Sequence, residues 1–165
     1  MKLNDKITGG TSMKKLFILA LFIVASIMLF VQQSRAQEAL TGTWKTIADD
    51  GRDKGKASSY LQIYENDGMY HARVIKLLNH PQDVLCKDCK GNLKNKPIVG
   101  LHVFTNMKKS GNVEKDFGEE YAGGQIMDPE NGNFYKCKIW IKGDTIVVRG
   151  YLAFFYRTQR WYRLI

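Results

Sequence analysis

The amino-acid sequence predicts an all-β fold, an eight-stranded antiparallel up-and-down barrel. Within residues 134–142 one face carries Tyr135, Cys137, Ile139 and Ile141 and the other carries Lys136, Lys138 and Lys142, which is the period of a strand with one face in a core and one in water. Turn sequences rich in Asn, Asp and Gly separate several β-rich segments. A closed barrel suits eight short antiparallel strands because closure leaves no exposed sheet edge, and a small sandwich is the alternative.

The strands are predicted in order along the chain. The first contains Gly42-Thr43-Trp44, and a Gly- and Asp-rich loop over 49–55 follows it. Asn66-Asp67-Gly68 is a strong hairpin signal between the second and third strands. A turn or two of helix is an alternative only within residues 107–121. The predicted strands cover residues 40–47, 58–65, 69–78, 98–105, 122–127, 134–142, 146–152 and 160–164.

The N-terminal segment has the layout of a secretory signal peptide. Two lysines precede an apolar run over residues 16–31, and a small-x-small sequence ends at Ala36. We expect cleavage between Ala36 and Gln37, and we predict Met13 as the true start. The run of 16 residues is short for a bilayer span, which needs about 20, so a retained anchor is the alternative. The predicted location is periplasmic or secreted.

The chain is basic, with 25 Lys and Arg residues against 16 Asp and Glu residues, a net charge of +9. Removal of residues 1–36, the predicted signal peptide, takes away five basic and one acidic side chain and leaves +5 on residues 37–165, predicted as a single domain. A basic domain often binds nucleic acid, but export separates this one from nucleic acid. An anionic envelope component is the expected partner of the basic surface, and solubility alone is the simpler explanation of the charge.

Six short motifs follow one another along the mature chain. They are Gly42-x-Trp44, Cys86-x-x-Cys89, Pro97-Ile98-Val99-Gly100-Leu101, Gly124-x-Ile126-x-Asp128-Pro129-x-Asn131-Gly132-x-x-Tyr135, Arg149-Gly150-Tyr151 and Thr158-Gln159-x-Trp161-x-Arg163. Together they resemble an uncharacterised bacterial family of exported proteins, the domain-of-unknown-function family numbered 2147. The resemblance implies a lipocalin-like (calycin-type) β-barrel and an envelope location, and it implies no activity and no catalytic residues.

Gly42-x-Trp44 also resembles the Gly-x-Trp signature of lipocalin-type barrels, in which a tryptophan closes one end beneath an arginine of the last strand. The matching C-terminal residues here are Trp161 and Arg163. The resemblance therefore implies that Trp44 and Arg163 form the barrel closure. An arginine over a tryptophan face contributes roughly 0.5–2 kcal/mol.

Cys86 and Cys89 lie in a long loop over residues 79–96. We predict that they form a local disulfide in an oxidising periplasm, one that shapes the loop more than it stabilises the fold, by about 2 kcal/mol. A redox-active pair is an alternative that lacks its usual βαβ context, and a zinc site with His80 lacks a second CxxC pair. Cys137 is predicted as a buried thiol, with pairing to one of the loop cysteines as the alternative.

Aromatic residues gather near the C-terminus. Phe154, Phe155 and Tyr156 are predicted in a loop, where they are candidates for an apolar lip or ligand-pocket residues. The pattern leaves open whether Arg149 faces into or out of the barrel. Asp128 is interpreted as a turn residue that bonds to the turn backbone rather than as a catalytic carboxylate.

No pattern in the sequence assigns a catalytic residue, a metal or a cofactor, and we predict that the protein is not an enzyme. His71, His80 and His102 are scattered and are interpreted as structural or surface residues. The leading hypothesis is an envelope binding protein for a small apolar or amphipathic ligand. The alternative is a filled barrel that binds a protein or the envelope surface through the basic loop around the CxxC motif, and an enzyme of unknown reaction comes third. The sequence does not predict the oligomeric state.

Overall fold

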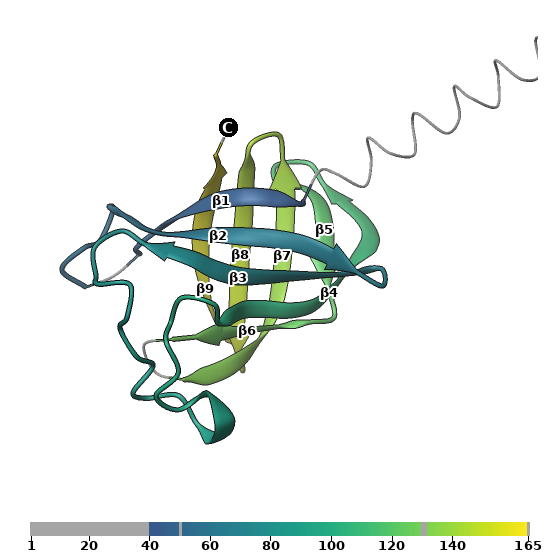
Figure 1. Cartoon of the computed structure of the whole chain (residues 1–165). Helices are drawn as coiled ribbons and strands as arrows, with labels where there is room; N and C mark the ends of the chain where they lie inside the picture. The colour runs from purple at the N-terminus through teal and green to yellow at the C-terminus, as the bar shows by residue number, and fades with distance from the viewer. Residues whose placement is uncertain (1–39, 50, 130–131, 165) are drawn as a thin grey trace, which may run out of the picture. The chain divides into compact units, whose positions relative to one another are not determined.

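The computed structural model describes residues 40–49, 51–129 and 132–164, so the predicted signal peptide lies outside the described residues. The described chain forms a closed antiparallel barrel in which each strand pairs with its neighbours and the last returns to the first (Figure 1). Its strands are β1 (Gly42–Ile47), β2 (Ala57–Asn66), β3 (Met69–Leu77), β4 (His102–Glu114), β5 (Gly118–Ala122), β6 (Gln125–Asp128), β7 (Asn133–Lys142), β8 (Thr145–Leu152) and β9 (Phe155–Arg163). A single 3-10 turn, η1 (Gly91–Leu93), lies between β3 and β4. Among the described residues, no helix is long and apolar enough to span a membrane.

Strands β5 and β6 share one position in the barrel wall. Both pair with β4 on one side and β7 on the other. The chain is interrupted at Gly124, whose backbone lies so close to β4 that a Cβ atom there would come within 2.1 Å of the Thr105 carbonyl oxygen. Nine strand segments therefore build the eight-stranded wall that the sequence predicts.

Three predicted strand boundaries are wrong. Strand β4 begins at His102 rather than Ile98, because residues 98–101 form a turn in which the Leu101 N–H bonds to the Ile98 carbonyl at 3.1 Å. At its other end β4 continues into a hairpin with β5, where the sequence left room for helix. On the β4 side of this hairpin the side chains of residues 108–114 are all exposed, so they show no alternation of buried and exposed positions. Strand β9 begins at Phe155 rather than Arg160, which places Phe155 and Tyr156 in the wall instead of a loop.

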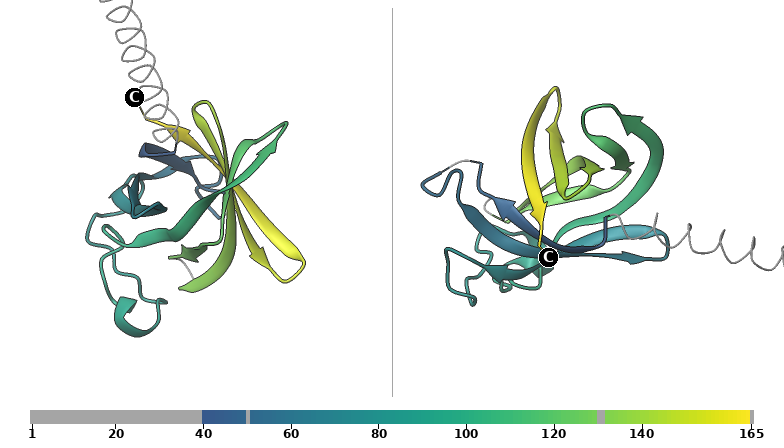
Figure 2. Two further views of the ribbon diagram at one scale, coloured as in Figure 1. Left: turned by 90° about the vertical axis from the view of Figure 1, so that its right-hand side faces the viewer. Right: turned by 90° about the horizontal axis from the view of Figure 1, so that it is seen from above.

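The two ends of the barrel differ in the turns that they carry and in how their interior is filled. The β4–β5 and β7–β8 turns lie at one end, and the β8–β9 turn lies at the other (Figure 2). The interior near the first end is filled by fully buried large side chains, namely Leu40, Trp44, Leu61, Ile63, Phe104, Met107, Tyr121, Ile139, Ile146 and Trp161. Phe104 stacks on Trp161, with ring centroids 6.1 Å apart. We call this half the closed half and the other the open half.

Candidate functional site

A cavity of about 530 Å³ occupies the open half of the barrel. Apolar side chains from every strand except β5 line most of it, among them Leu61, Val74, Leu77, Val103, Ile126, Val148 and Trp161. Several residues belong both to the buried core and to the lining, so together they form the boundary between the filled half and the cavity: Leu61, Val74, Leu77, Val103, Val148 and Trp161. Ligand sites in proteins are typically about 300–1,000 Å³ and mostly apolar, and this cavity has those properties.

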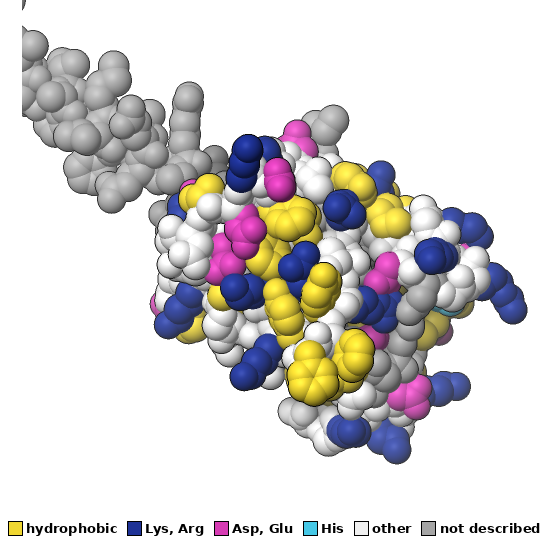
Figure 3. All heavy atoms as spheres, turned by 180° about the vertical axis from the view of Figure 1, so that it is seen from behind, with side chains coloured by type: hydrophobic (Ala, Val, Ile, Leu, Met, Phe, Trp, Pro, Cys, Tyr) yellow, Lys and Arg dark blue, Asp and Glu magenta, His cyan; other side chains and the backbone are white. Residues whose placement is uncertain are grey.

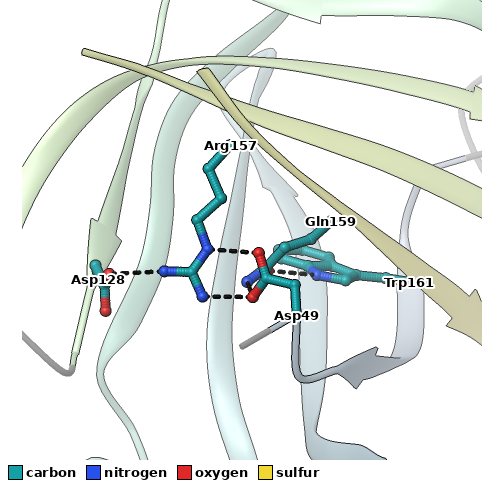
Figure 4. A network of polar contacts seen from close by, with 5 residues as sticks. All are labelled: Asp49, Asp128, Arg157, Gln159 and Trp161. Carbon is teal, nitrogen blue, oxygen red and sulfur yellow. Dashed lines mark hydrogen bonds and ion pairs between the residues drawn. The ribbon is translucent and has the colours of Figure 1, made fainter. Parts of the chain in front are cut away.

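A network of polar side chains lies in the cavity wall (Figure 4). Strand β9 presents Arg157, Gln159 and Trp161 on one face because alternate residues of a strand point to the same side. The Arg157 guanidinium binds the Asp49 carboxylate through Nε and Nη2, and its Nη1 lies 3.6 Å from Asp128 Oδ2. The Gln159 amide donates to Asp49 at 2.9 Å and accepts from the Trp161 indole N–H at 3.1 Å.

Asp49 is ionised within this network. Burial alone would raise the pKa of its carboxyl group, but the hydrogen bonds from Arg157 and Gln159 and the guanidinium charge outweigh burial. The pKa of Asp49 is therefore lowered from its ordinary value. The network combines a carboxylate that stays charged at neutral pH with a guanidinium already bound to it.

The loop between β3 and β4 builds one side of the cavity. Val84 and Ile98 from this loop line the cavity, and the Ile98 N–H donates to the Val84 carbonyl at 2.8 Å. The predicted disulfide between Cys86 and Cys89 is confirmed, and both cysteines are buried against Leu101 and Met127.

Gly132 joins this loop to the β6–β7 turn. A Cβ atom at Gly132 would come within 2.3 Å of the Asp88 carbonyl oxygen and 2.5 Å of Cys89 Cα. The turn itself closes with the Gly132 N–H on the Asp128 carbonyl at 2.7 Å. Only glycine fits this contact, because its φ of +67° is also in the left-handed region.

The closed half holds the pair that resemblance assigned to the barrel closure. The Arg163 guanidinium lies 4.2 Å from the centroid of the Trp44 ring, in cation–π contact. The Trp44 indole N–H donates to the Leu40 carbonyl at 3.0 Å, and Arg163 Nη1 donates to the Thr41 carbonyl at 2.9 Å. Gly42 allows this approach, since a Cβ atom there would lie 2.9 Å from Arg163 Nη1.

The three aromatic residues considered for a lip lie around the β8–β9 turn. Phe155 lines the cavity, and Phe154, which does not, is 91% exposed within the turn. Tyr156 borders the cavity, but its ring packs on Arg149 at the outer face. Leu152, at the end of β8, is another exposed lining residue. We call Leu152, Phe154 and Phe155 the apolar rim.

The outer face of β7, β8 and β9 carries a second cluster of aromatic and basic side chains. Val148 and Gly150 line the cavity, so Arg149 between them faces outward. Its guanidinium lies 4.3 Å from the Tyr156 ring centroid and 5.1 Å from that of Trp140. Seen from behind, apolar and basic side chains are interleaved on this face (Figure 3).

Tyr64, His71 and His102 form a polar and aromatic cluster away from the cavity. Tyr64 and His102 form a hydrogen bond of 2.6 Å, and His71 stacks on Tyr64. Burial, with the nearby positive groups, lowers the pKa of His102.

Within residues 40–49, 51–129 and 132–164, no group of three or more His, Cys, Asp or Glu side chains could hold a metal ion.

Cys137 lies in the core and has no disulfide partner. Burial raises the pKa of its thiol to about 12, so the thiol stays protonated and unreactive at neutral pH. This agrees with the prediction of a buried thiol and not with pairing to the loop cysteines.

Comparison with known proteins identifies the family. A family model described as "Uncharacterized protein conserved in bacteria (DUF2147)" matches residues 42–163, from the first residue of β1 to the last of β9. The chain belongs to this family. The sequence motifs therefore indicated the DUF2147 family correctly.

A solved structure shows the fold of this DUF2147 chain. The structure is described as "Protein HP1028 from the human pathogen Helicobacter pylori belongs to the lipocalin family". It has a TM-score of 0.61 and 18% sequence identity, over 76% of this chain and 83% of that one. At that identity the likeness shows the fold alone, a lipocalin-like barrel. No curated protein matches the chain.

The structure brings some predicted residues together and adds others. Phe155 and Tyr156 lie at the cavity, while Trp44 and Arg163 lie in the closed half. Asp49, Arg157 and Gln159 are site residues that no sequence pattern indicated, and Asp128 was predicted only as a turn residue. The alternation of side chains along β9 could have indicated two of them. If Trp161 points into the barrel, Gln159 and Arg157 point the same way, because alternate residues of a strand share a face.

Proposed function

We propose that this protein is a non-catalytic binding protein of the bacterial envelope that holds a small apolar or amphipathic ligand in the open half of its barrel. The cavity of about 530 Å³ with its apolar lining carries the proposal. The lipocalin-like fold and the family are compatible with ligand binding. Export rests on the sequence of residues 1–36, which have the layout of a signal peptide.

Within this proposal each part of the barrel has a separate role. Trp44 and Arg163 close the filled half, and the apolar rim of Leu152, Phe154 and Phe155 guides a ligand into the cavity. Exposed apolar side chains beside an apolar cavity support this role, because large exposed apolar groups often mark binding sites.

A second candidate function uses the outer surface. Lys87, Lys90, Lys94 and Lys96 are exposed on the loop that carries the disulfide, and they would bind a protein or an anionic envelope component. The cavity favours the first candidate, since a surface module needs no interior space. Filling the cavity would leave this second kind of binding unchanged.

A cavity-filling substitution tests the first candidate. Val103 lines the cavity, and Val103→Phe should lower the affinity for the uncharged probe N-phenyl-1-naphthylamine at least about tenfold by occupying the space. The same change at Val113, which is 72% exposed on the same strand, is the matched control and should have no effect. Overpacking costs about 1–3 kcal/mol of stability, so circular dichroism should show that both variants are folded. Unchanged probe affinity in a folded Val103→Phe protein would contradict the proposal.

A further inference from the structure

The polar part of the cavity wall carries more negative than positive charge. Arg157 lies between the carboxylates of Asp49 and Asp128. It is the one basic Lys or Arg side chain among the described residues that line the cavity, and His80 is the other nitrogen base there. With histidine neutral, these described groups have a net charge of −1.

The Arg157 guanidinium already has partners within the protein. Two of its nitrogens bind Asp49, and the third faces Asp128. A ligand carboxylate that approached Arg157 would therefore meet two carboxylates as well as one guanidinium. Burying an anion without a partner of its own is costly, so the bound ligand would have to lose its charge or keep that end in water.

An uncharged polar group has partners at the same place. Gln159 uses one amide hydrogen toward Asp49 and one lone pair toward Trp161, while a glutamine side chain offers two donors and two lone pairs. A hydroxyl group can therefore bond to Gln159 or donate to Asp49. An ammonium group would gain from both carboxylates.

We propose that the cavity selects apolar ligands whose polar end is uncharged or cationic, and that it discriminates against ligands that end in a carboxylate. This selectivity rests on the function proposed above, and it assigns Asp49, Asp128 and Arg157 as the groups that determine it.

The net charge of the whole protein is positive, opposite in sign to that of the cavity wall. The chain carries +9 and attracts anions at long range, but at about 0.15 M salt such attraction is screened beyond about 8 Å. A ligand whose polar end reaches this network is within contact distance of the Asp49 and Asp128 carboxylates, whose side chains are 23% and 21% exposed. The local charge therefore decides which ligand stays bound.

Displacement of N-phenyl-1-naphthylamine from the mature protein tests the inference. The competitors are decan-1-ol, decylammonium and decanoate, which share one chain length and differ in the charge of the polar end. We expect decan-1-ol and decylammonium to displace the probe at concentrations at least about tenfold lower than decanoate.

Two substitutions should move the selectivity in opposite directions. Asp49→Asn removes one negative charge and should reduce the discrimination against decanoate at least about threefold. Arg157→Gln leaves both carboxylates and should increase it, with tighter binding of decylammonium. Asp67→Asn is the matched control, because Asp67 lies in the β2–β3 turn with a φ of +52° that asparagine tolerates. It makes the same change in net charge away from the cavity.

The outcomes separate the inference from the proposed function. Equal displacement by decan-1-ol and decanoate, in a protein that binds the probe, would overturn the selectivity and leave the binding function standing. The same shift in Asp67→Asn as in Asp49→Asn would also overturn it, since overall charge would then be the cause. No binding of probe or competitor at all would overturn both.

Discussion

Glu120 is the one acidic side chain among the described residues that is almost fully buried, and it faces the outside of the barrel beside Trp140. Lys138 binds it at 2.9 Å and Asn112 donates to it at 3.2 Å. Burial would raise the pKa of Glu120, but these bonds and one from Ser110 outweigh burial and lower it from 4.5. A buried acid is tolerated here because each carboxylate oxygen has a partner.

This pairing predicts how stability depends on pH. A carboxyl group whose pKa is lowered by folding binds protons less readily when folded, so its stabilisation is present above its ordinary pKa and is lost as the pH falls through the lowered value. Asp49 acts in the same direction. The free energy of unfolding, measured with urea, should fall gently below pH 6.5, because the pKa of His102 is also lowered by folding, and more steeply below about pH 5 as the carboxyl groups are protonated.

Glu120→Gln should lower the free energy of unfolding by about 1–3 kcal/mol at pH 7, because it removes the charge that Lys138 binds. It should also make the acid decline shallower. Glu114→Gln, an exposed position on the same hairpin, is the control and should change little. An equal loss in the two variants would contradict this role of Glu120.

The pairs that make the cavity network could not be predicted from the sequence. Asp49 and Arg157 are separated by 108 positions, and only the register between β9 and β1 brings their ends together. Cys86 and Cys89 could be predicted, since a separation of three residues permits a local bridge in an oxidising compartment. Local chemistry was therefore accessible to sequence reasoning, and contacts across the barrel were not.

Strands could be predicted where buried and exposed side chains alternate along the chain. In β7 the core-facing Cys137, Ile139 and Ile141 alternate with lysines except at Trp140, which is buried on the outer face, so most of the period of this strand is visible in the sequence. The β4–β5 hairpin has polar side chains on both faces beyond Met107, so its period is hidden. The break between β5 and β6 comes from the close approach of Gly124 to β4, which no local pattern reports.

The contact between the disulfide loop and the β6–β7 turn predicts a specific effect of substitution at Gly132. Gly132→Ala should destabilise the protein more than Gly143→Ala and should weaken probe binding, because the added Cβ displaces the loop that carries Val84 and Ile98. Both glycines have positive φ, +67° and +59°, but nothing lies within 4 Å of a Cβ at Gly143. The alanine at Gly143 therefore reports backbone strain alone, about 1–2 kcal/mol.

Urea unfolding of the two variants gives the comparison directly. Equal losses of stability, with unchanged probe affinity in Gly132→Ala, would show that the loop is not held against the turn in the way the structure indicates.

The barrel as a whole combines the two interiors that an eight-stranded barrel allows, one filled by side chains and one open to a ligand. The closed half contains Trp44, Phe104 and Trp161 and supplies most of the buried aromatic packing. The open half contains the cavity, the disulfide loop and the apolar rim. Stability and binding are thereby assigned to different ends of the same strands.

Whether the cavity holds a ligand decides the proposed binding function. Native mass spectrometry of residues 37–165, the mature protein if export is as proposed, produced in a bacterial periplasm and purified without detergent, tests this before and after extraction with organic solvent. We predict a reproducible extra mass that is lost on extraction and belongs to a compound with an uncharged or cationic polar end. A protein that always appears at its bare mass, and that takes up no added apolar compound, would contradict the proposed binding function.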